Sequence, residues 1–236
     1  MSSSKDVVRE LNSLATPQKA KASAWFFKTG PGQYGEGDQF IGVTMPEQRV
    51  VAKQFRDLPL AEIEELVTSP IHEHRMTGLI ILVDQFKKAD GASRKTIYDF
   101  YLAHTANVNN WDLVDGSAEL IVGPYLQDKD KSILTRLAMS DLLWDRRIAM
   151  ISTFHYIKQG DPTEAFKIAE ILMNDKEDLM HKAVGWMLRE VGKKCGREVL
   201  IDFLATHYQT MPRTALRYSI EHFDADTRQA YLKGKI

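Results

Sequence analysis

The chain has 236 residues, of which 44% are hydrophobic and 27% are charged, and its formal net charge is −1 at pH 7. This length suffices for one sizeable core or two small ones, and the composition is ordinary for a soluble globular protein. The lack of a run of about eighteen apolar residues excludes a membrane-spanning helix, and a single cysteine, Cys195, excludes an intramolecular disulfide. We therefore expect a cytoplasmic protein.

The predicted elements, taken from the N-terminus, are helices. Residues 1–14 have no apolar core of signal-peptide length and begin as a helix with a serine cap. The glycine-rich segment at 30–37 lacks the Gly-Lys-Ser/Thr ending of a phosphate-binding loop, so we interpret it as a mobile connector. Pro46 opens the next helix, and apolar residues then recur at helical spacing to the end of the chain. The pattern predicts an all-α protein of twelve to fourteen helices.

The sequence "HEH" at 72–74 is the one motif that we considered as a metal-binding site. Histidines two residues apart do not face one another on a helix, and we find no third ligand. We expect no metal and no cofactor.

A repeat becomes visible when the longer helical segments are aligned. Between successive copies lies a second amphipathic helix, as in HEAT-like repeats. We therefore predict one domain over residues 1–236, a HEAT-like repeat solenoid of about six or seven antiparallel helix pairs with a concave face. The third residues of the copies are spaced by 35 or 36 positions: Met76, Trp111, Arg147, Lys182 and Arg217.

The segment "NNWDLVDGSAELI" at 109–121 breaks the apolar stripe that a buried helix needs. Trp111 and Asp115 are four residues apart and share a helix face, which places an indole beside a carboxylate. Asp112 is interpreted as an early-turn carboxylate favoured by the helix dipole. The alternative for Trp111, and equally for Trp186, is an ordinary core tryptophan.

Basic residues gather toward the C-terminus. The segment between positions 181 and 217 contains seven lysines and arginines but only three acidic residues. Arg147, Lys182 and Arg217 share the third repeat position, and Arg189 lies about one turn beyond Trp186. Such a surface permits phosphate binding without sequence readout. The alternative is that these long side chains only keep a face solvated.

Four motifs together resemble the AlkD family of DNA glycosylases, HEAT-like proteins that excise cationic alkylpurines. They occur in the family's order over nearly the whole chain. The motifs are "FIGVTMPEQR" (40–49), "NNWDLVDG" (109–116), "LLWDRRIAM" (142–150) and "HKAVGWMLREVGK" (181–193).

The resemblance implies a role for several positions. The family's catalytic carboxylate falls on Asp115, its cleft tryptophans on Trp111 and Trp186, and the arginine that grips the DNA backbone on Arg147. Phe26 stands where the family pattern has a tyrosine, which keeps the ring and loses the hydroxyl. The implied partner is double-stranded DNA containing alkylated purines, gripped by a monomer with an open cleft.

The implied chemistry is hydrolysis of the N-glycosidic bond of 3-methyladenine or 7-methylguanine. Lys182, Arg189 and Arg217 would then hold phosphates beside Arg147. Two alternatives stay open at this point. One is a non-catalytic DNA-binding or scaffold protein of the same family, and the other is a protein-binding adaptor, which would need an extended apolar groove.

Overall fold

The computed structural model describes residues 2–236, and it is all-α. Sixteen α-helices and one 3₁₀ helix lie in that range, and its only β-type pairing is an isolated bridge between Gln39 and Ile71. No helix in this range is long and apolar enough to cross a membrane. The predicted fold class is confirmed.

The chain divides into two compact units, here called the N-terminal unit, which ends at Ser117, and the C-terminal unit, Ala118–Ile236. The N-terminal unit contains α1 (Ser4–Leu14), α2 (Pro17–Phe26), α3 (Met45–Gln54), α4 (Leu60–Val67), α5 (His72–Lys88), α6 (Gly91–Ala103), the 3₁₀ helix η1 (Thr105–Asn107) and α7 (Trp111–Asp115).

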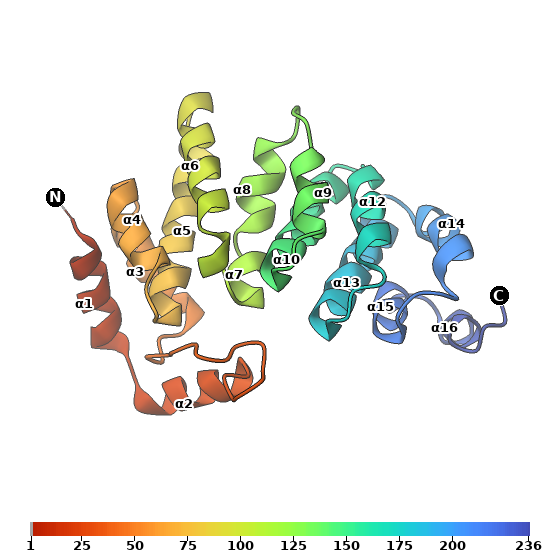
Figure 1. The fold of residues 1–236 in the computed structure, drawn as a ribbon, viewed down its shortest axis with the longest axis horizontal. Helices are drawn as coiled ribbons and strands as arrows, with labels where there is room; N and C mark the ends of the chain where they lie inside the picture. Colours follow the sequence, from red (N-terminus) through yellow and green to blue (C-terminus); the bar gives the residue numbers. More distant parts are fainter. Residues whose placement is uncertain (1) are drawn as a thin grey trace. The chain divides into compact units, whose positions relative to one another are not determined.

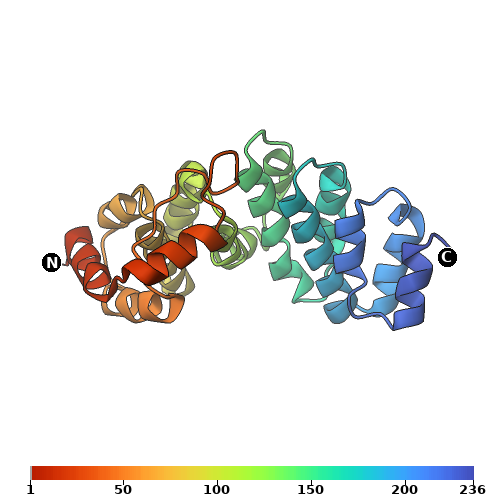
Figure 2. The same ribbon diagram turned by 90° about the horizontal axis from the view of Figure 1, so that it is seen from below.

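Helix α5 is the centre of the N-terminal unit and packs against α3, α4, α6 and α7. Residues 72–79 are buried on every side, although the first four of them are His72, Glu73, His74 and Arg75. Helix α2 does not join this packing side by side but runs across the ends of α3 and α5 (Figures 1 and 2). Four ionisable side chains at a buried helix start require partners, because an unpaired buried charge is costly.

Glu73 finds its partners in the segment before α3. Its carboxylate accepts hydrogen bonds from the backbone N–H groups of Ile41, Gly42 and Val43, the shortest being 2.8 Å from Gly42. Gly42 has a φ of 82°, and a Cβ atom there would lie 2.2 Å from the carbonyl oxygen of Thr16. Glycine is therefore required where the chain passes beneath the start of α2.

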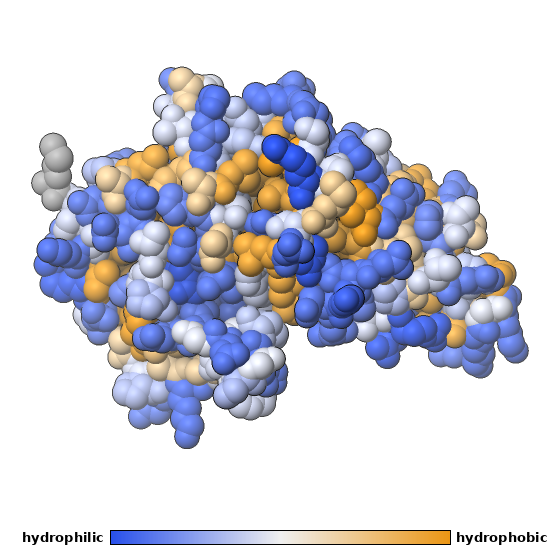
Figure 3. Space-filling view, viewed as in Figure 1, coloured by the Kyte–Doolittle hydropathy of each residue, from blue (hydrophilic) through white to orange (hydrophobic). Residues whose placement is uncertain are grey.

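The C-terminal unit consists of helices stacked in pairs. Its core is formed largely by α10 and α13, which pack against each other and against α9, α12, α14 and α15. On the face drawn in Figure 3, hydrophilic residues with a few apolar ones among them cover α15 and α16. The helices are α8 (Ala118–Tyr125), α9 (Ser132–Ala138), α10 (Leu143–Ser152), α11 (Phe154–Ile157), α12 (Thr163–Leu172), α13 (Asp178–Lys194), α14 (Arg197–His207), α15 (Arg213–Ser219) and α16 (Ala225–Leu232).

Two segments expected as single helices are broken, which accounts for a helix number above the prediction. Residues 109–121 contain α7 and the first half of α8, and residues 145–157 contain most of α10 and all of α11. Hydroxyl groups bond to backbone carbonyls at both breaks: Ser117 to Leu113 at 2.5 Å, and Thr153 to Met150 at 2.7 Å. Such bonds compete with the helix ladder and bend helices. The single domain and the concave face stay predictions.

Candidate functional site

Helix α7 carries the two residues on which the predicted site depends. It is a single turn of five residues, capped by Asn110, whose side-chain oxygen accepts the backbone N–H of Trp111 at 2.9 Å. Trp111 and Asp115 are both half-buried, whereas Leu113 and Val114 between them are buried. Asp115 is thus not sealed in the core, and its spacing from Trp111 places both on one face of the turn.

Aromatic rings surround Trp111 within the N-terminal unit. Phe27 stacks on the indole with ring centroids 5.4 Å apart, and Phe26 meets it edge-on at 6.0 Å. Phe27 also stacks on Phe40 at 5.1 Å. Phe26 is 54% exposed, so this predicted residue presents a ring at the surface beside Trp111. The structure therefore brings together Phe26, Trp111 and, on the same turn, Asp115.

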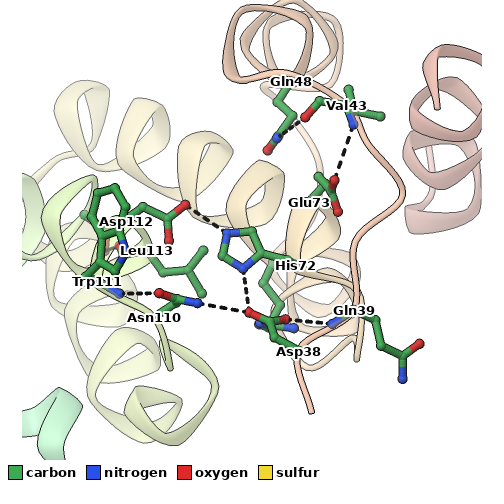
Figure 4. A network of polar contacts seen from close by, with 12 residues as sticks. Asp38, Gln39, Val43, Gln48, His72, Glu73, Asn110, Trp111, Asp112 and Leu113 are labelled. Atoms are coloured by element: carbon green, nitrogen blue, oxygen red, sulfur yellow. Dashed lines mark hydrogen bonds and ion pairs between the residues drawn. The ribbon is translucent and has the colours of Figure 1, made fainter. Parts of the chain in front are cut away.

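A buried polar network lies behind α7 (Figure 4). The His72 imidazole bonds through Nε2 to Asp112 Oδ2 at 2.9 Å and through Nδ1 to Asp38 Oδ2 at 2.7 Å. The Asp38 carboxylate also accepts hydrogen bonds from Arg75 Nη2 at 2.7 Å and from Asn110 Nδ2 at 3.2 Å. The side chains of His72, Asp38 and Arg75 are no more than 4% exposed.

The electrostatics of this network follow from its charges. Burial opposes a charge on His72, but the hydrogen bonds and charges of Asp112 and Asp38 outweigh it and raise the pKa of His72 to about 9. Burial likewise opposes ionisation of Asp38, yet His72 and Arg75 lower the pKa of that carboxyl. The raised pKa of His72 follows from its place between the side chains of Asp38 and Asp112.

The tryptophan and the arginine predicted in the C-terminal unit lie in different surroundings. Trp186 is half-buried on α13, and its ring centroid is 6.0 Å from that of Phe154. Arg147 on α10 is only 5% exposed, and its Nη1 donates to the carbonyl oxygen of Leu179 at 2.9 Å. The Arg147 side chain is thus almost entirely enclosed by the protein itself.

The remaining predicted cations of the C-terminal unit differ in exposure and pairing. Lys182 is half-buried and pairs with Asp178 at 2.7 Å. Arg189 is held by Glu190 at 3.1 Å and by Glu221. Arg217 is exposed on α15. Nearby carboxylates therefore neutralise part of the positive charge that the sequence places in this unit.

Three residues of this site were not predicted from the sequence: Asp38, His72 and Phe27. Asp38 follows the glycine-rich segment that we interpreted as a connector, and Asp112 is not only a carboxylate at a helix start, because it pairs with His72. One signal was present in the sequence: the ionisable run "HEHR" at 72–75 stands at the start of the same helix as the mostly apolar run 76–83. Among residues 2–236, no group of three or more His, Cys, Asp or Glu side chains could hold a metal ion.

Comparisons with known proteins agree with this description. A family model described as DNA alkylation repair enzyme matches residues 7–223. A solved structure from Enterococcus faecalis, described as a predicted DNA alkylation repair enzyme, superposes with a TM-score of 0.70 over 89% of this chain and 97% of that chain, at 16% sequence identity. At this identity the likeness concerns the fold. Among curated proteins no match is found.

Proposed function

Because the chain belongs to the DNA alkylation repair enzyme family, we propose that it is a DNA glycosylase that removes cationic alkylpurines from duplex DNA. The substrates would be bases such as 3-methyladenine and 7-methylguanine, and the bond hydrolysed would be the N-glycosidic bond. We further propose that it acts in the cytoplasm as a monomer.

The observation that carries this proposal is the construction of α7. A five-residue helix places a carboxylate, Asp115, and an indole, Trp111, on one half-buried face, beside the surface-exposed ring of Phe26. A turn that served only the core would present apolar residues there, as it does at Leu113 and Val114. Acid and aromatic side chains together suit a cationic ligand.

The chemistry asks little of the protein beyond charge stabilisation. An alkylated purine already carries a positive charge and departs as a neutral base, so no general acid is needed. The deoxyribose becomes oxocarbenium-like as the bond stretches, and Asp115 would stabilise that cation and align the attacking water. A carboxylate about 4 Å from a unit charge gains about 4 kcal/mol at an effective dielectric constant of about 20, which corresponds to roughly a thousandfold in rate.

The tryptophans and cations would serve binding. Trp111 and Trp186 offer electron-rich faces to a cationic base or sugar. Arg217, which is exposed, and Lys182 are the residues of the C-terminal unit best suited to phosphates, and Arg189 would have to exchange its carboxylate partners for them. Arg147 would contact the DNA backbone from its buried position on α10. Such contacts make binding strongly dependent on salt.

One assay tests the proposal. Duplex DNA treated with a methylating agent is incubated with the protein, and free 3-methyladenine and 7-methylguanine are quantified. We expect wild type to release them and Asp115→Asn to slow the release by about a thousandfold while binding duplex DNA like wild type. Arg217→Ala is the matched binding variant and should weaken duplex binding and reduce the salt slope by about one.

The alternatives give different results in the same assay. A non-catalytic scaffold of the family would bind the duplex and release no base. A protein-binding adaptor would do neither. Full base release by Asp115→Asn would remove Asp115 from the reaction even if the enzyme is active.

A further inference from the structure

Helix α7 is too short to hold its own position. A single turn fixes several backbone dihedrals for very few hydrogen bonds, so an isolated turn of this length is unstable in water. Its internal backbone bonds include those from Val114 to Asn110 at 3.2 Å and from Gly116 to Asp112 at 2.9 Å. The placement of the Trp111 and Asp115 side chains must therefore come from contacts outside the helix.

Two polar connections tie the start of α7 to a single carboxylate, that of Asp38. One passes through Asn110, which caps the helix through its oxygen and bonds Asp38 through its nitrogen at 3.2 Å. The other passes through His72, which bridges Asp38 and Asp112 (Figure 4). Asn110 and His72 are 0% and 2% exposed, so water does not replace these bonds.

The His72 ring is also fixed in orientation. Its centroid lies 4.5 Å from that of Phe40, stacked at 24°, and 4.9 Å from that of Phe27. Phe27 in turn stacks on Trp111. The imidazole therefore reaches α7 both through a hydrogen bond to Asp112 and through an aromatic contact that continues to the indole.

We propose that His72 is a positioning residue for the reaction. Bridging Asp38 and Asp112 across the buried side of α7, it fixes the orientation of the turn and hence of Trp111 and Asp115. This inference rests on the proposed function, and it assigns His72 no contact with substrate. The raised pKa of His72 agrees with this geometry, because an imidazolium donates from both nitrogens at once.

Hydrogen exchange of the free protein tests the structural part without any substrate. His72→Phe keeps a ring between Phe27 and Phe40 and removes both hydrogen bonds. The backbone amides of Val114, Gly116 and Ser117 should then exchange about tenfold faster or more, as expected when a locally stabilised segment loses its anchors. His72→Gln keeps one possible hydrogen bond and should give an intermediate rate.

Asp175→Asn provides the matched control. Asp175 is an equally buried carboxylate, 4% exposed, and pairs with Arg146 in the C-terminal unit at 2.6 Å. This substitution should leave the α7 amides at their wild-type rates. If it accelerates them as much as His72→Phe does, the effect is a general loss of stability and the proposal is wrong.

Base release tests the functional part. With methylated duplex DNA, single-turnover release by His72→Phe should fall by about a hundredfold, the scale expected of a misplaced catalytic group, while duplex affinity stays near that of wild type. Unchanged release would overturn the positioning role even if the α7 amides exchange faster. If wild type itself releases no base, the proposed function fails, and unchanged α7 exchange would separately refute the anchoring by His72.

Discussion

Helices α5 and α10 begin in nearly the same way, although they belong to different units. Each follows a serine, Ser69 or Ser140, whose hydroxyl accepts a backbone N–H from two residues later, at 3.1 and 3.2 Å. Six residues after each serine an arginine, Arg75 or Arg146, donates Nη1 back to the serine carbonyl oxygen at 3.0 Å. The repeat is therefore present in the hydrogen bonds as well as in the apolar pattern.

The likeness extends to the charge that neutralises each arginine. Arg75 pairs with Asp38 at 2.7 Å, and Arg146 pairs with Asp175 at 2.6 Å. Both carboxylates are 4% exposed and come from segments 37 and 29 residues away in the sequence. These bonds pair buried carboxylates with arginines at the start of a helix, which is a requirement of folding in either unit.

The difference lies three residues after the serine. There α10 has Leu143, whereas α5 has His72, which joins Asp38 to Asp112. The repeat alone does not need this histidine, because α10 begins without one. The comparison separates the part of the network that builds a helix start from the part that reaches α7.

The largest expected effect comes from removing the arginine that the two helix starts share. Arg146→Met should cost about 3 kcal/mol of unfolding free energy, because a buried carboxylate, Asp175, loses its counterion. Arg75→Met should cost less, about 2 kcal/mol, since Asp38 keeps His72 and Asn110 as donors. Urea unfolding of both variants measures the difference. A greater loss for Arg75→Met would show that His72 does not share the charge of Asp38.

A pH titration sharpens the difference between the two starts. The pKa of His72 is raised from 6.5 to about 9, so its stabilisation is fully present below pH 6.5 and is lost as the pH rises through 9. The groups facing the imidazole are Asp38 and Asp112, with Arg75 beyond Asp38. Between about pH 8 and pH 10, wild type should lose about 1.3 kcal/mol more than His72→Phe. Parallel urea-derived stability curves for the two proteins would contradict this assignment.

The smallest effect tests whether the two starts are equivalent. Ser69→Ala and Ser140→Ala each remove a hydroxyl that bonds a backbone N–H and a side chain five residues on, His74 or Asp145. Each should cost about 1 kcal/mol, the usual range for a lost cap. Thermal unfolding compares them directly, and losses that differ by about 1 kcal/mol or more would mean that the turns do not carry equal weight.

Local sequence patterns predicted the fold and part of the candidate site, but not the contacts between residues far apart in the sequence. Apolar spacing predicted the all-α fold and the repeat, because it records which face of each helix is buried. The shared helix face of Trp111 and Asp115 could also be predicted, because it depends only on their spacing of four residues. Asp38, His72 and Asp112 are instead 34 and 40 residues apart, and no local pattern connects them. The helix breaks at Ser117 and Thr153 depend on hydroxyl bonds that spacing does not reveal.

The close approach at Gly42 has a consequence for how the protein can vary. A methyl group at this position would enter the space occupied by the carbonyl oxygen of Thr16 and the amide nitrogen of Ala20. The start of α2 would have to lift, and the strained φ of 82° would remain. A saturation library at residue 42 should therefore retain glycine alone among folded clones, whereas the neighbouring Ile41, which is half-buried, tolerates other apolar side chains.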